Sequence, residues 1–133
     1  MGEVRVDMRL KGEKGELELK DILVDTGATY TVLNKRDLEE VGAYKMRETW
    51  VSLGNKERVK ATRYAATIVI GERECDTIIL TFKDAERVIG LLTLESIGLK
   101  VNPMKGELEP AREANLAYFF YHEEDKTRCS ETY

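Results

Sequence analysis

The sequence holds few of the residues from which disulfide frameworks and metal centres are built. Its 133 residues include one histidine, His122, and two cysteines, Cys75 and Cys129, which lie far apart. This spacing predicts neither a disulfide framework nor a metal-ligand cluster, so we expect no metal site. Unpaired cysteines favour a reducing compartment, the cytoplasm. A solvated surface position is expected for His122.

Long apolar runs and basic runs are missing as well. No apolar run is long enough to span a membrane. The first ten residues, MGEVRVDMRL, lack the apolar stretch of a secretory signal. The net charge is −4, and no run of lysine and arginine forms a stripe that would bind phosphates. These absences argue against a membrane protein and against a nucleic-acid-binding protein.

The patterns that are present predict a mostly β domain. A hydrophobic content of 42% in 133 residues is enough for one domain with a core. Polar and apolar residues alternate over 3–10, and a second strand is expected over 17–24 after a glycine-containing turn at 11–16. Further strands are expected over residues 48–53, 57–71 and 75–82. A closing hairpin is expected over 99–110, with its turn at Pro103 to Gly106.

Two short helices interrupt the strands. One is expected over 34–43, with Asn34 as N-cap and Gly42 as C-terminal stop, and the other over 91–98, closed by Gly98. Their sequences, DLEEVG and TLESIG, resemble each other, and each follows an apolar strand that ends in a glycine turn. This faint repeat predicts two related half-units about an internal pseudo-twofold axis.

The segment ILVDTGATYTVL, residues 22–33, places an ionisable Asp25 between two apolar runs that are expected to be buried. An unpaired buried carboxylate is costly, and no basic residue follows before Lys35. One interpretation is structural: Asp25 caps a turn, and Gly27 supplies a positive φ. The other interpretation is a catalytic carboxylate.

The segment LVDTGATYTVL resembles the active-site segment of the retropepsin-like aspartic proteases. The resemblance continues in RVIGLLTLESIGL, which is similar to the second signature of that family, and LGNKERV falls where the family has its flap hairpin. It implies a single-domain retropepsin-like (acid protease) β-barrel with a flap hairpin over residues 1–110. Residues 111–133 would be a C-terminal extension of unknown role.

The resemblance implies an aspartic endopeptidase that uses no cofactor. Two carboxyl groups share one water: one is ionised and takes a proton from the water, and the other is protonated and hydrogen-bonds the scissile carbonyl. The chain has one Asp-Thr-Gly, and the second signature carries no acid. The second carboxyl group would therefore come from a second copy, in a homodimer with the two Asp25 side chains at its axis. Peptides or unfolded proteins would be the substrates.

Further roles follow from the resemblance alone. Thr26 would hydrogen-bond across the dimer axis, and Gly27 and Ala28 would let the substrate lie close. Gly90 would pack against the catalytic loop. The flap tip would be Gly54, Asn55 and Lys56. Val88 and Ile89 would line substrate subsites, although plain core positions explain these two residues equally well.

Three residues depart from the viral members of the family. Thr29 and Tyr30 stand where those members usually carry an acid, and Leu91 stands where they carry an arginine. In the viral fold these two groups form an ion pair, so the absence of both leaves no charge without its partner. It suggests a cellular branch of the family with weaker contacts to the peptide backbone. Two other functions stay open: a dimeric module that grips peptides by strand addition, and a purely structural dimerisation domain.

The C-terminal tail carries an apolar stripe at helical spacing: Leu116, Phe119 and Phe120. Packing on its own domain, packing at the dimer interface and fraying are three open interpretations. We expect the stripe to pack across or beside the dimer interface.

Overall fold

The first two strands, β1 (Val4–Gly12) and β2 (Gly15–Val24), form the antiparallel hairpin that the alternation of polar and apolar residues predicts. The turn between them is shorter than expected. Only Glu13 and Lys14 lie outside the strands, because the pairing continues to Gly12 opposite Gly15. The register then places Val4, Met8 and Leu10 on the buried side of β1.

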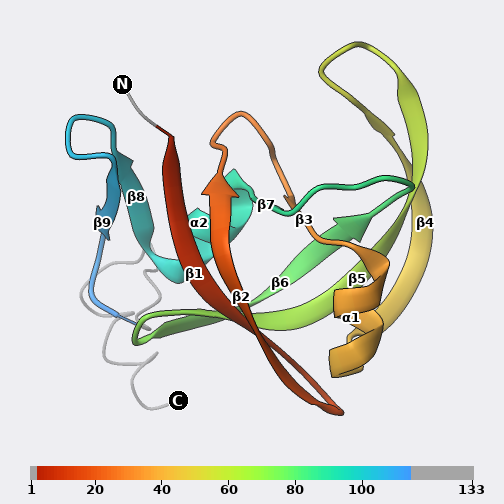
Figure 1. Cartoon of the computed structure of the whole chain (residues 1–133), viewed down its shortest axis with the longest axis horizontal. Helices are drawn as coiled ribbons and strands as arrows, with labels where there is room; N and C mark the ends of the chain where they lie inside the picture. The colour runs from red at the N-terminus through yellow and green to blue at the C-terminus, as the bar shows by residue number, and fades with distance from the viewer. Residues whose placement is uncertain (1–2, 115–133) are drawn as a thin grey trace, which may run out of the picture.

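The structure, a computed structural model, describes residues 3–114 (Figure 1). The tail stripe of Leu116, Phe119 and Phe120, together with His122 and Cys129, lies outside the described residues. The remaining elements are β3 (Thr31–Val32), α1 (Lys35–Val41), β4 (Tyr44–Ser52), β5 (Arg58–Ile70), β6 (Arg73–Thr81), β7 (Val88–Ile89), α2 (Leu91–Ile97), β8 (Leu99–Asn102) and β9 (Glu107–Pro110).

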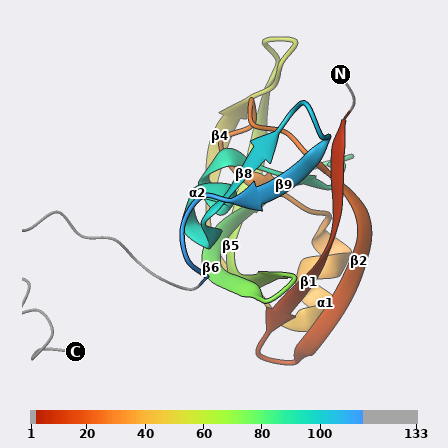
Figure 2. The same cartoon turned by 90° about the vertical axis from the view of Figure 1, so that its left-hand side faces the viewer.

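Six strands close into a barrel. The order in the sheet is β1-β2-β7-β3-β6-β5-β4, and β1 also pairs with β5, so β4 is attached at the edge outside the closed ring. Figure 2 shows the barrel from the side, with β8 and β9 as a separate two-stranded sheet. Two pairings, β2 with β7 and β3 with β6, are parallel. The expected mostly β barrel with two short helices is confirmed.

Both helices begin and end where the sequence predicts. The Asn34 side chain accepts a hydrogen bond from the backbone N–H of Asp37 (2.9 Å), which caps α1. Gly42 and Gly98 follow α1 and α2 in the left-handed conformation, with φ of 72° and 78°. Each of these glycines donates its N–H to carbonyls of the preceding helix turn. The weak sequence repeat thus corresponds to a shared helix ending.

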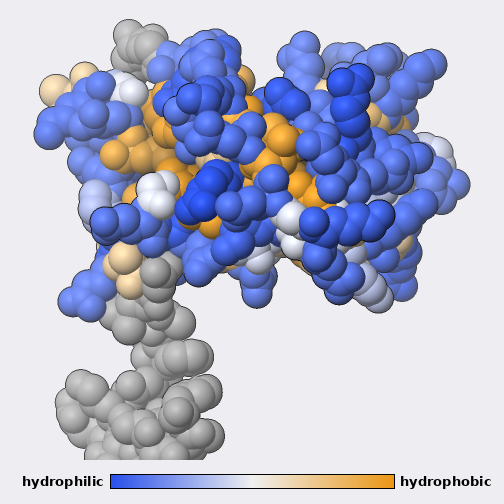
Figure 3. All heavy atoms as spheres, turned by 60° about the horizontal axis from the view of Figure 1, so that its bottom comes forward, coloured by the Kyte–Doolittle hydropathy of each residue, from blue (hydrophilic) through white to orange (hydrophobic). Residues whose placement is uncertain are grey.

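The core fills the barrel between the sheet and the two helices. Its fully buried side chains include Leu10 on β1, Leu38 on α1, Ile79 on β6 and Leu94 on α2. Several other apolar side chains are only partly buried against this core. Figure 3 shows apolar atoms in a band between hydrophilic side chains on one face. No helix within residues 3–114 is long and apolar enough to cross a membrane.

The chain remains attached to the fold slightly beyond β9. The N–H of Ala111 donates to the carbonyl of Gly98 (2.8 Å), and the Arg112 guanidinium donates to the carbonyls of Glu95 and Ser96 (2.7 Å each). Arg73 in turn donates to the carbonyl of Arg112 (2.7 Å). These contacts fix residues 111 and 112 at the C-terminal end of α2.

Candidate active site

Asp25 follows β2 directly, at the start of a loop that leads to β3. Its flanking strand residues Ile22 and Val24 are buried, whereas Asp25 itself is exposed in the single chain. The burial expected for the segment therefore holds for its apolar residues and not for the carboxylate. Exposure removes the desolvation cost that made an unpaired carboxylate at this position puzzling.

Short contacts orient the Asp25 carboxylate. The N–H of Gly27 donates to Oδ1 of Asp25 (2.9 Å), and the N–H of Ala28 donates to the Asp25 carbonyl (3.0 Å). The Asp25 N–H donates to the carbonyl of Ile89 (2.9 Å) on β7. The loop is thus a tight turn whose first residue is anchored to the neighbouring strand.

The second glycine signature braces the loop from the other side. Leu91 and Leu92 donate their N–H groups to the carbonyls of Ala28 (2.8 Å) and Thr29 (3.0 Å). A Cβ at Gly90 would lie 2.4 Å from the carbonyl carbon and oxygen of Tyr30. Only glycine permits this approach, so Gly90 packs directly against the loop that carries Asp25.

Two buried threonines complete this brace, and the sequence analysis did not single them out. The N–H of Gly90 donates to Oγ1 of Thr31 (3.0 Å), and the hydroxyls of Thr31 and Thr93 lie 2.7 Å apart. Both side chains are fully buried. The available signal was a threonine shortly after each glycine signature, inside an otherwise apolar run.

A cleft of about 470 Å³ opens beside the loop. The loop forms part of its lining, and the end of β4 with the tip of the β4–β5 hairpin forms another part. This hairpin projects from the barrel in Figures 1 and 2. The lining residues are Asp25, Gly27, Ala28, Thr29, Tyr30, Val32, Val51, Ser52, Leu53, Gly54, Leu80 and Phe82. Asp25 contributes the one ionisable carboxylate to a lining that is otherwise neutral and largely apolar.

The tip of this hairpin is a turn closed by backbone hydrogen bonds. Leu53 donates its N–H to the carbonyl of Glu57 (2.7 Å), and Lys56, with φ of 68°, donates to Leu53 (2.9 Å). The Asn55 side chain hydrogen-bonds Glu57. Of the three expected flap-tip residues, Gly54 lines the cleft, while Asn55 and Lys56 lie in the turn and do not.

Four other expected site residues lie outside the cleft lining, and Gly90, which packs against the loop, is one of them. Thr26 is exposed in the loop, next to Asp25. Val88 is half-buried and pairs with β2 and β3. Ile89 is completely buried in the core. Of the two interpretations given for Ile89, the structure places it in the core, away from the cleft.

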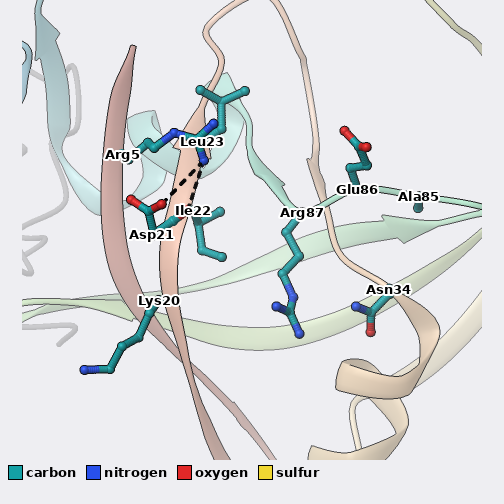
Figure 4. A pocket seen from close by; sticks show the side chains of 9 residues that line it. All are labelled: Arg5, Lys20, Asp21, Ile22, Leu23, Asn34, Ala85, Glu86 and Arg87. Carbon is teal, nitrogen blue, oxygen red and sulfur yellow. Dashed lines mark hydrogen bonds and ion pairs between the residues drawn. The ribbon is translucent and has the colours of Figure 1, made fainter. Parts of the chain in front are cut away.

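An ion pair that the sequence analysis missed joins the second signature to α1. Arg87 donates from Nε and Nη2 to the two oxygens of Asp37 (2.7 and 2.8 Å), whose side chain is 3% exposed. This hydrogen bonding raises the pKa of the Arg87 guanidinium. Figure 4 shows Arg87 beside Asn34, near the start of α1, in a second hollow that residues 20–23 of β2 also line. The pair holds β7, which anchors Asp25, against the helix.

Cys75 has no features of a nucleophile. Burial raises the pKa of its thiol to about 11, so it stays protonated at neutral pH. Within residues 3–114 there is no cluster of three or more His, Cys, Asp or Glu side chains that could hold a metal ion. The chemistry that the cleft offers is that of one oriented, exposed carboxylate.

Comparison with known families gives a match that covers more than half of the chain. Residues 6–96 match the family model described as aspartyl protease. The matched range includes the Asp25 loop, the hairpin over the cleft and the second glycine signature. No curated protein matches the chain.

Proposed function

Because the chain belongs to the retropepsin-like aspartyl protease family, we propose that it is a homodimeric endopeptidase whose active site is shared between two copies. The observation that carries this proposal is the cleft lining, in which Asp25 is the one carboxylate and is exposed on a braced loop. Hydrolysis of a peptide bond by water needs a second carboxyl group. A second copy related by a twofold axis beside Asp25 supplies it.

In the proposed reaction the two Asp25 side chains share one proton, because two adjacent carboxylates do not both ionise cheaply. The ionised carboxylate takes a proton from water, and the water oxygen adds to the scissile carbonyl carbon. The protonated carboxyl group hydrogen-bonds the carbonyl oxygen. Transfer of a proton to the amide nitrogen then breaks the C–N bond and leaves a carboxylic acid and an amine.

The surrounding residues have supporting roles in this proposal. Thr26, exposed beside Asp25, contacts the partner loop across the axis. The hairpin between Val51 and Gly54 closes over the peptide and excludes water. Apolar lining at Val32, Leu80 and Phe82 favours substrates with large apolar side chains next to the cleaved bond.

The decisive experiment compares the full chain with two asparagine variants on an unfolded protein substrate. Asp25→Asn removes the proposed catalytic carboxyl group, and Asp21→Asn removes a carboxyl group four residues earlier that lies outside the cleft. We expect cleavage by the wild type and Asp21→Asn and none by Asp25→Asn. The specific rate should also fall on dilution below the dimer dissociation constant.

The outcome separates the proposal from its alternatives. A peptide-binding module would bind unfolded peptides equally well in the wild type and in Asp25→Asn, and would cleave neither. A structural dimerisation domain would neither bind unfolded peptides nor cleave them. Cleavage at an undiminished specific rate by a monomer, measured by light scattering, would rule out the shared site.

A further inference from the structure

Arg63 on β5 lies against the wall of the cleft. Its guanidinium carbon is 6.0 Å from the centre of the Tyr30 ring, and Tyr30 lines the cleft. In the register of β5 and β6, Arg63 stands directly opposite Leu80, which lines the same cleft. Directly opposed residues on antiparallel strands point to the same face of a sheet. Two cleft residues thus place Arg63 at the margin of the substrate site.

The charge of Arg63 has no counterion within residues 3–114. The residue is only partly exposed, and its Nε is buried without a hydrogen-bond partner. Arg87, in contrast, holds both oxygens of Asp37. An arginine keeps its charge at any ordinary pH, and a half-buried charge normally acquires a partner.

The contact with Tyr30 leaves the two terminal Nη groups of Arg63 available, while Nε is buried. An aromatic ring attracts a guanidinium through its π face, and this contact does not use the N–H donors that lie in the guanidinium plane. Those donors match the two oxygens of a carboxylate. Arg63 therefore resembles one half of an ion pair whose other half arrives with a ligand.

We propose that Arg63 binds a carboxylate of the peptide substrate, and that the enzyme prefers peptides with an acidic residue a few positions from a large apolar residue at the cleaved bond. This inference rests on the proposed function, because it assigns the substrate class of the same cleft. The apolar lining receives the residues at the bond, and Arg63 binds an acidic residue beside Tyr30. In the twofold dimer one Arg63 stands on each side of the bond.

The test uses decapeptides with a central Phe-Phe, neutral polar residues elsewhere and blocked ends. Glutamate is moved through each position on either side of the bond, and each peptide has a glutamine twin. The wild type should cleave the glutamate peptide with a kcat/KM about tenfold or more above its twin at one distance from the bond, the range of a charge-assisted hydrogen bond. The preference should shrink in high salt.

Two variants give the comparison its control. Arg63→Met should abolish the preference, so that its kcat/KM for each glutamate peptide equals its kcat/KM for the glutamine twin. Arg58→Met removes an arginine from the same strand whose guanidinium carbon also lies near an aromatic ring, 5.8 Å from the centre of Trp50; neither Arg58 nor Trp50 is part of the cleft lining. It should keep the full preference. Arg63→Met should melt close to the wild type, since it loses the contact with Tyr30 but also removes a buried Nε that has no partner, whereas a purely structural role for Arg63 predicts a markedly lower melting temperature.

Binding measurements separate this inference from the proposed function. Fluorescent versions of the same peptides are titrated against Asp25→Asn, with and without Arg63→Met, and binding is followed by anisotropy. Tighter binding of the glutamate peptides that disappears with Arg63→Met supports the inference even if the wild type cleaves nothing. Cleavage or binding without a glutamate preference, or a preference that survives Arg63→Met, overturns it. Peptides with a free C-terminal carboxylate at the preferred position show whether a chain end serves equally well.

Discussion

The substitution Gly90→Ala should disable the site although Gly90 lies outside the cleft lining. The backbone of Gly90, with φ of −96° and ψ of 172°, is one that alanine adopts freely, so backbone conformation adds no penalty. The penalty is steric. The new Cβ would lie 2.4 Å from two backbone atoms of Tyr30, so the loop and the start of α2 must separate by about 1 Å to reach ordinary contact.

This separation has a cost that follows from the hydrogen bonds across the gap. The bonds from Leu91 to Ala28 and from Leu92 to Thr29, now 2.8 and 3.0 Å, would exceed hydrogen-bonding distance. Their loss, at about 1 kcal/mol each, together with overpacking of about 1–3 kcal/mol, lowers the free energy of unfolding by about 3–5 kcal/mol. A displacement of about 1 Å near Asp25 should also slow peptide hydrolysis about 100-fold.

Urea unfolding and peptide hydrolysis measure the two effects. Gly54→Ala is the control for stability, because a Cβ there meets no atom within 4 Å, and we expect its free energy of unfolding to change by less than about 0.5 kcal/mol. If Gly90→Ala unfolds like the wild type and cleaves at the same rate, the packing of Gly90 on the loop does not position Asp25.

Three further predictions concern other parts of the molecule. Arg87→Met should lower the free energy of unfolding by about 2 kcal/mol because it leaves the buried Asp37 carboxylate without its cationic partner. Adding Asp37→Leu should recover part of the loss. Additive effects of the two substitutions in urea unfolding would show that the two residues are not coupled. The pKa of Cys75 is about 11, against an ordinary 9.0. In a chain whose other cysteine is removed by Cys129→Ser, Cys75 should therefore react with iodoacetamide at pH 8 about 100-fold more slowly in the folded protein than in urea. Equal rates would exclude a protected thiol. Deleting residues 115–133, which spares the anchored Arg112, should weaken dimerisation if the apolar tail stripe packs at the interface and raise the cleavage rate if the tail restrains the cleft; no change in either would contradict both.

Local patterns were enough to predict most elements of the fold. The capping asparagine and the two left-handed glycines fixed both helices, because each acts on backbone groups within one turn of itself. Alternation gave the long strands, although β4 begins at Tyr44, four residues before the expected Glu48. Tyr44 and its neighbours are exposed on an edge strand, so no buried face imposes an alternating pattern there.

Contacts between distant residues were outside the reach of the sequence. The Asp-Thr-Gly segment identified the carboxylate, but its exposure depends on how β2, β7 and β3 meet. The partners Arg87 and Asp37 are separated by 50 positions, and Thr31 and Thr93 by 62. In the sequence, Arg63 is one of several polar residues in an alternating strand, and its position beside Tyr30 follows only from the closure of the barrel. No local sequence pattern predicts these long-range pairs.

The brace behind the Asp25 loop also determines when the site can first exist during synthesis. Asp25 is made early, but the backbone groups that anchor its loop belong to Ile89, Leu91 and Leu92, and β1 cannot complete its pairing before residues 67–69 of β5 are present. At about 5–20 residues per second, the ribosome works for several seconds between these points. A nascent chain therefore carries its carboxylate long before it carries a cleft. Products that terminate before residue 89 retain Asp25 but lack every contact that the second glycine signature makes with its loop.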